Sequence, residues 1–238
     1  MNKTPKENAA MYAAKKLDNE SYIIFGSGST VDLIISYLGK FHQSLNNLKV
    51  VSASSSTSKQ LSDNSIREIS ISELHDQTRN IDVICVDGAD EVIFDSNKQP
   101  KVILKGHGGA LLREKILWEL GHKVIVVIDE SKMKDKITKY IPIEVVPFAV
   151  NLIINQIQSI LPSISARLRI STDKTPLVTD NHNNIIEIHH QGFKFDVQEF
   201  HETIMHLTGV VETGIFGDKY IENTCYIIGY EDKVDVID

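Results

Sequence analysis

The sequence predicts an α/β protein, with a doubly wound parallel sheet as its main domain and a smaller α+β domain inserted into it. The first observation is that short β-branched apolar runs alternate with helical segments in the first half of the chain. Strands that are apolar on both sides suit a parallel sheet covered by helices on each face. The second observation is a change of rhythm near Thr138, after which the predicted elements follow the order β-α-β-β-α-β.

The main domain is predicted from five apolar runs in the first half of the chain: YIIF (22–25), LKVVSA (48–53), IDVICVD (81–87), KVIL (101–104) and KVIVVID (123–129). A glycine turn and the helix TVDLIISYL (30–38) follow the first run. The serine-rich segment SASSSTSK (52–59) is predicted to be a polar loop. Alternating strands and helices imply right-handed crossovers in a Rossmann-like sheet, which binds ligands at the carboxyl ends of its strands.

The inserted domain is predicted from six further segments: IPIEVVPF (141–148), AVNLIINQIQSIL (149–161), ARLRI (166–170), NIIEIHH (184–190), VQEFHETIMHL (197–207) and GVVETGIF (209–216). Their order is the ferredoxin-like one. The last run, TCYIIGY (224–230), is predicted to return to the first sheet. We therefore expect a Rossmann-like catalytic domain of residues 1–137 plus 220–238 and an inserted ferredoxin-like domain of residues 138–219.

Composition excludes several classes of protein. The 238 residues carry a formal net charge of -7, which argues against binding to nucleic acid and against adsorption to an anionic membrane. Cys85 and Cys225 lie in apolar runs and are predicted to be buried thiols, and the nine histidines form no metal set. The first 20 residues are too polar for a signal peptide and no apolar run reaches membrane length, so a cytoplasmic protein is expected.

The segment FGSGSTVD (25–32) is a candidate phosphate loop. It follows a strand and opens a helix, whose first turn offers unpaired N–H groups and the positive end of the helix dipole. Ser27, Gly28, Ser29 and Thr30 are the candidate binding residues. The segment lacks the Lys-Ser/Thr of a Walker loop and the third glycine of a dinucleotide fingerprint. The alternative is a plain strand-to-helix turn with an N-cap.

Acidic residues follow the strand that ends at Val86. Asp87, Asp90 and Glu91 lie in the segment VDGADEV (86–92), with Gly88 at the turn. Carboxylates at this edge could bind a sugar hydroxyl, bind a metal or move a proton, and they are also common turn residues.

The segment KGHGGALLREKI (105–116) combines a basic residue, a glycine-rich turn and a helix. Lys105 follows a strand, and the glycines bring backbone N–H groups to the same edge of the sheet. On the predicted helix, Glu114 has Ala110 and Leu111 one turn before it and Leu117 and Trp118 one turn after it. Burial among apolar neighbours favours the protonated form of a carboxyl group, which suits a base that works near neutral pH. The alternative is a structural pairing of Glu114 with Arg113 or Lys115.

Together these segments resemble the A-type ribose-5-phosphate isomerase family over nearly the whole chain. The resemblance rests on the order and spacing of eight segments: GSGST (26–30), SASSSTSKQL (52–61), DGADE (87–91), KGHGGALLREK (105–115), IDESK (128–132), EVVPFA (144–149), VTDNHNN (178–184) and GVVETGIF (209–216). It implies reversible isomerisation of D-ribose 5-phosphate to D-ribulose 5-phosphate through an enediolate, in the non-oxidative pentose phosphate pathway, with no cofactor and no metal.

The resemblance also implies a role for each candidate residue. Glu114 matches the general base, Asp87 the acid/base group at the sugar oxygens, and Lys105 the cation that faces the developing oxyanion. The implied substrate-binding positions are Ser27, Gly28, Ser29, Thr30, Asp87, Gly88, Ala89, Asp90, Lys105, Gly106, His107, Gly108 and Lys132. A homodimer or homotetramer with a small sugar phosphate as its ligand is expected, with neither nucleic acid nor membrane as a partner.

The chain departs from the family pattern at two places. His107 stands where the family usually has glycine, and its side chain is expected to crowd the loop or to point to solvent while leaving the backbone donors in place. The family also often places a phosphate-binding lysine near the N-terminus, where this chain has Lys6 and Glu7. The alternative functions are a non-catalytic sugar-phosphate sensor, which would not need Glu114, and a nicotinamide-dependent dehydrogenase, which the incomplete glycine fingerprint disfavours.

Overall fold

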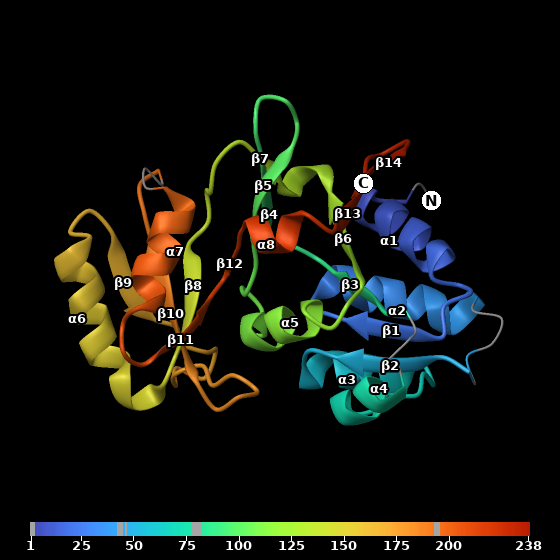
Figure 1. Ribbon diagram of the computed structural model, residues 1–238, viewed down its shortest axis with the longest axis horizontal. Coiled ribbons are helices and arrows are strands. Elements are labelled where there is room, and N and C mark those ends of the chain that lie inside the picture. The colour runs from blue at the N-terminus through green and yellow to red at the C-terminus, as the bar shows by residue number, and fades with distance from the viewer. Residues whose placement is uncertain (1–2, 42–44, 46, 78–81, 193–195) are drawn as a thin grey trace. The chain divides into compact units, whose positions relative to one another are not determined.

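The computed structural model describes residues 3–41, 45, 47–77, 82–192 and 196–238 (Figure 1). The chain divides into two compact units. Unit 1 comprises Met1–Ala89, Arg113–Lys132 and Glu222–Asp238, and unit 2 comprises Asp90–Leu112 and Met133–Ile221. This division differs from the expected boundaries, because Asp90–Leu112 pairs with strands of unit 2 and not with the parallel sheet.

Unit 1 contains a six-stranded sheet in the order β14-β13-β6-β3-β1-β2. Its strands are β1 (Tyr22–Phe25), β2 (Lys49–Ser52), β3 (Ile84–Asp87), β6 (Lys123–Asp129), β13 (Thr224–Gly229) and β14 (Val234–Ile237). All neighbours are parallel except β13 and β14, which form an antiparallel hairpin. The predicted parallel sheet is therefore confirmed, together with the return of the last apolar run to it, whereas the edge strand β14 was not predicted.

Helices cover the parallel sheet. Those of unit 1 are α1 (Pro5–Lys16), α2 (Ser29–Phe41), α3 (Ser55–Asp63) and α4 (Ile71–Gln77), and α5 (Leu111–Trp118) begins in unit 2 and ends in unit 1. Apolar side chains of α1 and α2 pack on alternate strand positions such as Phe25 and Val86. The intervening positions, such as Ile24 and Cys85, are also fully buried. Burial on both faces explains why these strands are continuously apolar.

Three helices of unit 1, α1, α3 and α4, arise from segments in which no helix was predicted. A capping box formed by Thr4 and Glu7, with Pro5 in the first turn, starts α1. The prediction of a loop at residues 52–59 is wrong, because Ser54 caps α3 by accepting a hydrogen bond from the Thr57 N–H at 3.1 Å. A serine at the N-cap stabilises the first turn of a helix when its hydroxyl accepts the backbone N–H three residues later. This cap outweighs the weak helix propensity of the serines that follow Ser54.

The chain reverses its strand order at β1, which has β2 on one side and β3 on the other. Such a switch point opens a crevice at the carboxyl ends of the two strands. The loop that starts at Gly26 leaves β1 there, and the loop that starts at Gly88 leaves β3. This edge of the sheet therefore carries the candidate site residues of unit 1.

Unit 2 contains a four-stranded antiparallel sheet in the order β11-β8-β10-β9. Its elements follow one another as β8 (Ile141–Val145), α6 (Val150–Ile160), β9 (Ser165–Leu168), β10 (Asn184–His189), α7 (Val197–Met205) and β11 (Val210–Thr213). Isoleucines of the two helices, such as Ile153 and Ile204, pack with strand residues such as Ile143 and Ile186 in one core.

A second small sheet in unit 2 corrects the assignment of KVIL to the parallel sheet. It has the order β12-β5-β4-β7, from β4 (Glu91–Phe94), β5 (Pro100–Leu104), β7 (Met133–Lys134) and β12 (Ile215–Phe216). The strands β4 and β5 form an antiparallel hairpin, whose turn is held by Asp95 accepting the N–H groups of Asn97 and Gln99.

Three short helical turns complete the secondary structure of the described residues: η1 (Glu130–Lys132) in unit 1, and η2 (Pro147–Ala149) and α8 (Asp218–Ile221) in unit 2.

Among the helices of the described ranges, none combines the length and the apolar character that a membrane crossing requires.

Candidate active site

The loop between β1 and α2 has the geometry of an anion site. Gly28 has φ +96°, a left-handed conformation that glycine adopts without a steric penalty, and α2 begins at the next residue. The first turn of this 13-residue helix presents its N–H groups and the positive end of its dipole. Lys6 adds a cation, because its Nζ donates a hydrogen bond to Ser29 Oγ at 3.1 Å. The sequence alone left the role of Lys6 open.

Asp87 is a fully buried carboxylate at the carboxyl end of β3. Its Oδ1 accepts hydrogen bonds from the N–H groups of Gly88 at 2.7 Å and Ser27 at 3.3 Å. Its Oδ2 accepts from Trp118 Nε1 at 3.0 Å. Three N–H donors therefore fix the orientation of one carboxylate, and they come from both loops and from α5.

Glu114 is 2% exposed, so the burial expected from its apolar neighbours is confirmed. Its Oε1 accepts a hydrogen bond from the Ser27 hydroxyl at 2.7 Å. Ser27 thus contacts both carboxylates, donating its N–H to Asp87 and its O–H to Glu114. Two acids that were predicted from separate motifs meet at one residue of the candidate phosphate loop.

The serine-rich segment supports this loop, although it was predicted only as a polar connection. Thr57 is fully buried, and its Oγ1 donates to the carbonyl oxygen of Gly26 at 3.0 Å. Ser54 in turn hydrogen-bonds the Thr57 hydroxyl at 2.9 Å. The helix start at Ser54 therefore fixes the backbone that carries Ser27. The signal in the sequence that could have identified this support is the N-cap spacing, in which Ser54 precedes Thr57 by three residues.

Lys105 and the glycine-rich loop belong to unit 2. Lys105 is 3% exposed; its N–H donates to the Gly214 carbonyl at 2.9 Å, and its Nζ lies 5.9 Å from the centre of the Phe216 ring. Gly106 has φ +98°, and a Cβ there would lie within 2.9 Å of Leu111 and Pro142 side-chain atoms. Both the backbone conformation and the packing require glycine at residue 106.

His107 neither crowds this loop nor points to solvent, so that expectation is wrong. Its ring stacks on Tyr140 with centroids 4.0 Å apart and planes 3° apart, and its Nε2 lies 3.0 Å from the Tyr140 carbonyl oxygen. The His107 N–H donates to Asp90 Oδ2 at 3.0 Å. Burial lowers the pKa of His107, although Asp90, 3.8 Å from Nδ1, acts in the opposite direction.

The remaining predicted residues occupy loops and a short helical turn. Gly88 and Ala89 follow β3, Gly108 is an exposed residue of the 105–108 loop, and η1 places Lys132 after β6, the strand beside β3. In the described part of the chain, His, Cys, Asp and Glu form no group of three that could hold a metal ion. An apolar pocket of about 270 Å³ between α1 and α2 is lined by residues such as Met11 and Phe41 and by none of the predicted site residues.

Comparison with known proteins gives consistent matches. Residues 49–233 match the family described as Ribose 5-phosphate isomerase A (phosphoriboisomerase A). Ribose-5-phosphate isomerase A of Archaeoglobus fulgidus is 31% identical over 225 residues, which cover 93% of this chain and 94% of that relative. The protein of the same name from Staphylococcus haemolyticus is 32% identical, covering 94% of this chain and 92% of its own length.

Two solved structures are similar over almost the entire chain. Ribose 5-phosphate isomerase A from Methanocaldococcus jannaschii has a TM-score of 0.82 at 27% identity, covering 98% of this chain and 97% of that one. A D-ribose-5-phosphate isomerase in complex with phospho-erythronic acid has a TM-score of 0.82 at 32% identity, with the same coverage.

Substituting Gly26 by alanine should disturb Asp87. A Cβ at residue 26 would lie 1.9 Å from Asp87 Cγ, so the carboxylate would have to leave its three donors. We expect Gly26→Ala to lower the free energy of unfolding by about 1–3 kcal/mol, the usual cost of overpacking. The control is Gly88→Ala, whose Cβ would have no neighbour nearer than 3.7 Å. Urea unfolding of both variants checks this, and equal stabilities would contradict the packing argument.

The titration of His107 should appear in the pH dependence of stability. Because its pKa is lowered below 6.5 in the folded protein, the unfolded chain binds more protons as the pH falls past 6.5. The stabilising contribution is therefore present above that pH and is lost as the pH falls through the folded-state pKa. His107→Phe keeps a ring on Tyr140 without the titration.

We expect the free energy of unfolding of the wild type, minus that of His107→Phe, to be constant above about pH 7 and to decrease towards about pH 5. Chemical unfolding at several pH values measures this difference. A difference that rises on acidification would show that Asp90 outweighs burial.

Proposed function

The chain belongs to the ribose 5-phosphate isomerase A family, and on that basis we propose that it interconverts D-ribose 5-phosphate and D-ribulose 5-phosphate. The observation that carries the proposal is the convergence of Asp87 and Glu114 on Ser27. An aldose–ketose isomerisation moves one proton between adjacent carbons and others between oxygens, and two fixed carboxyl groups can perform these transfers.

In the proposed mechanism Glu114 is the general base that moves a proton between C2 and C1 through an enediolate. Asp87 assists ring opening and exchanges protons with the sugar oxygens. Lys105 stabilises the negative charge of the enediolate oxygen, and Asp90 and the 106–108 backbone contact the sugar. Donors that are already oriented towards the developing charge lower the barrier most, because they need no reorganisation during the reaction.

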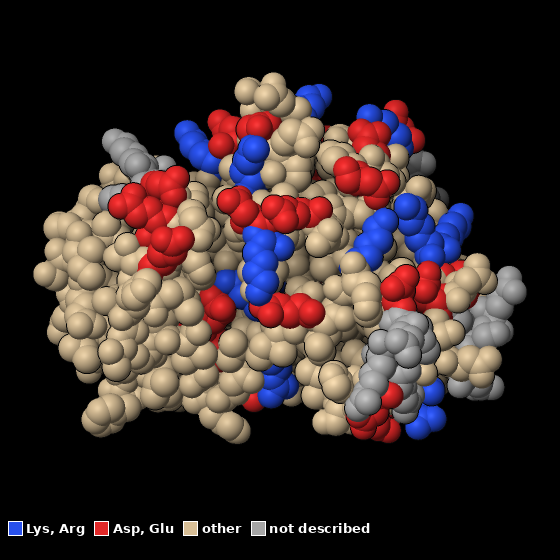
Figure 2. Space-filling view, viewed as in Figure 1, with Lys and Arg blue, Asp and Glu red and all other residues tan. Residues whose placement is uncertain are grey.

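The substrate phosphate is proposed to bind at the start of α2, to Ser27, Gly28, Ser29 and Thr30, with Lys6 and Lys132 as cations. The protein as a whole is acidic, so the attraction must be local. On the face shown in Figure 2, basic and acidic side chains are interspersed. Lys6 already lies at the loop through its hydrogen bond to Ser29, which supports its assignment.

Other features of the proposal follow the family. We infer that the β8-α6-β9-β10-α7-β11 region is a ferredoxin-like domain, since its chain order and its sheet order are those of that fold. A homodimer or homotetramer, a cytoplasmic location, and activity without a cofactor or metal remain predictions.

The direct test is formation of ribulose 5-phosphate from ribose 5-phosphate by the purified protein in the presence of a chelator. Activity that survives chelation supports the proposal, and binding of the sugar phosphate without turnover would instead identify a sensor.

Replacing the proposed base should reduce turnover selectively. Glu114→Gln keeps the size and the hydrogen-bonding capacity of the side chain but cannot accept the proton. We expect kcat to fall by about 10²–10⁴-fold while KM stays within several-fold. Glu119→Gln, an exposed position just beyond the end of α5, is the matched control. Near-normal turnover in Glu114→Gln would reject the assignment of the base.

Removing the cation at the phosphate loop should weaken binding. We expect Lys6→Ala to raise KM by about five- to tenfold with kcat nearly unchanged, because a contact present in both ground state and transition state affects binding uniformly. Lys3→Ala removes an exposed lysine on the same segment and is the control. If both variants show the same KM as wild type, Lys6 does not contact the phosphate.

A further inference from the structure

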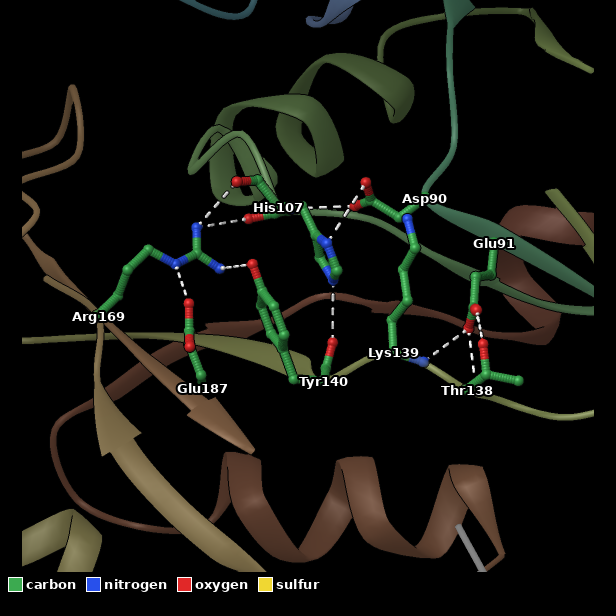
Figure 3. A network of polar contacts seen from close by, with 9 residues as sticks. Asp90, Glu91, His107, Thr138, Lys139, Tyr140, Arg169 and Glu187 are labelled. Carbon is green, nitrogen blue, oxygen red and sulfur yellow. Dashed lines mark hydrogen bonds and ion pairs between the residues drawn. The ribbon is translucent and has the colours of Figure 1, made fainter. Parts of the chain in front are cut away.

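Arg169 binds the backbone of the 105–108 loop within unit 2. It lies directly after β9 and is 7% exposed. Its Nη1 donates hydrogen bonds to two successive carbonyl oxygens, at 3.3 Å for Gly106 and 3.0 Å for His107 (Figure 3). One guanidinium nitrogen therefore contacts two adjacent peptide groups in the loop that carries the proposed substrate donors.

The guanidinium is itself held from two other sides. Its Nε donates to Glu187 Oε1 at 2.7 Å, and its Nη2 donates to the Tyr140 hydroxyl at 3.3 Å. The carbon at its centre lies 5.3 Å from the centre of the Tyr140 ring. Figure 3 shows Glu187, Arg169 and Tyr140 joined in this way. The planar guanidinium group has several N–H donors in fixed directions and can make these contacts simultaneously, whereas a lysine ammonium group cannot reproduce them.

These contacts determine where the loop N–H groups point. In a trans peptide the C=O and the following N–H point in opposite directions. Since the carbonyls of Gly106 and His107 point to Arg169, the N–H groups of His107 and Gly108 point away from it. The first of these donates to Asp90 Oδ2 at 3.0 Å, so Arg169 and Asp90 hold the Gly106–His107 peptide at its two ends.

The 105–108 loop needs these restraints because an unrestrained chain would also adopt many other conformations there. Gly106 has φ +98°, and glycine loses more conformational freedom on folding than any other residue. The stack of His107 on Tyr140 adds a second link to the same tyrosine that contacts Arg169. A loop that is fixed before substrate arrives does not have to be ordered during the reaction.

We propose that Arg169 is a positioning residue of the isomerase: it presets the 105–108 loop so that the Gly108 N–H, the Asp90 carboxylate that holds the His107 N–H, and Lys105 are correctly oriented for the sugar. Tyr140 and Glu187 act by holding Arg169. This inference rests on the proposed function.

The experiment measures kcat, KM and thermal unfolding for Arg169→Lys, Arg169→Ala and Tyr140→Phe in the full chain. Arg167→Met is the matched control, since Arg167 lies on β9 two residues earlier and is exposed. We expect kcat to fall by about 10–100-fold in both Arg169 variants, as for a misplacement of about 1 Å, and by less in Tyr140→Phe. The assay temperature is kept below the unfolding transition of every variant.

Guanidinium ion at a concentration that does not unfold the protein provides the decisive readout. It should restore part of the kcat of Arg169→Ala, because the ion can occupy the position of the missing side chain between Glu187 and the two carbonyl oxygens. It should not restore kcat in a variant that has lost activity through reduced stability at another position. Arg169→Lys keeps the positive charge, so a loss of kcat in that variant attributes the effect to the geometry of the fork.

Two results would overturn the inference. One is an unchanged kcat in folded Arg169→Lys. The other is a loss of activity that follows thermal stability alone and does not respond to guanidinium. If wild type isomerises ribose 5-phosphate and Glu114→Gln does not, either result rejects the role of Arg169 and leaves the proposed function intact. If wild type itself shows no isomerisation, the proposed function fails first.

Discussion

The contact on which the proposed chemistry depends is the double hydrogen bond of Ser27 to two buried carboxylates. The Ser27 N–H contacts Asp87 and its O–H contacts Glu114, at the edge of the sheet where β1 and β3 end. Several sequence features serve this arrangement. Gly26 leaves room for the Asp87 side chain, Trp118 contributes a donor from α5, and Thr57 fixes the peptide that precedes Ser27. Buried carboxylates need such partners because an unpaired buried charge is costly.

Each of the three carboxylates of the DGADE segment accepts hydrogen bonds from backbone N–H groups of its own unit. Asp87 accepts N–H groups of its own loop and of Ser27, and Asp90 accepts the N–H of His107. Glu91, which is fully buried, accepts the N–H groups of Thr138 at 2.9 Å and Lys139 at 3.3 Å. A structural role in the turn is therefore compatible with the proposed role of Asp87 and Asp90, since a carboxylate that orders backbone amides also becomes fixed in orientation.

Sequence patterns predicted the features that depend on local chemistry and burial. The continuously apolar runs gave the parallel strands β1, β3, β6 and β13, and the apolar neighbours of Glu114 gave its burial. The helix α1 was missed because its buried face consists of alanines, which form no strong apolar stripe. KVIL was assigned to the wrong sheet because periodicity does not identify a strand's partner. Arg169 was missed because its partners lie at Gly106, Tyr140 and Glu187, which no local pattern connects.

The path of the chain between the two units has a practical consequence. Unit 2 consists of Asp90–Leu112 and Met133–Ile221, so the backbone passes between the units after residues 89, 112, 132 and 221. No single internal deletion removes unit 2 alone, because such a cut would also take Arg113–Lys132, with Glu114 and strand β6. A gene that encodes one unit in isolation must therefore join segments that are not consecutive in the chain, through new linkers.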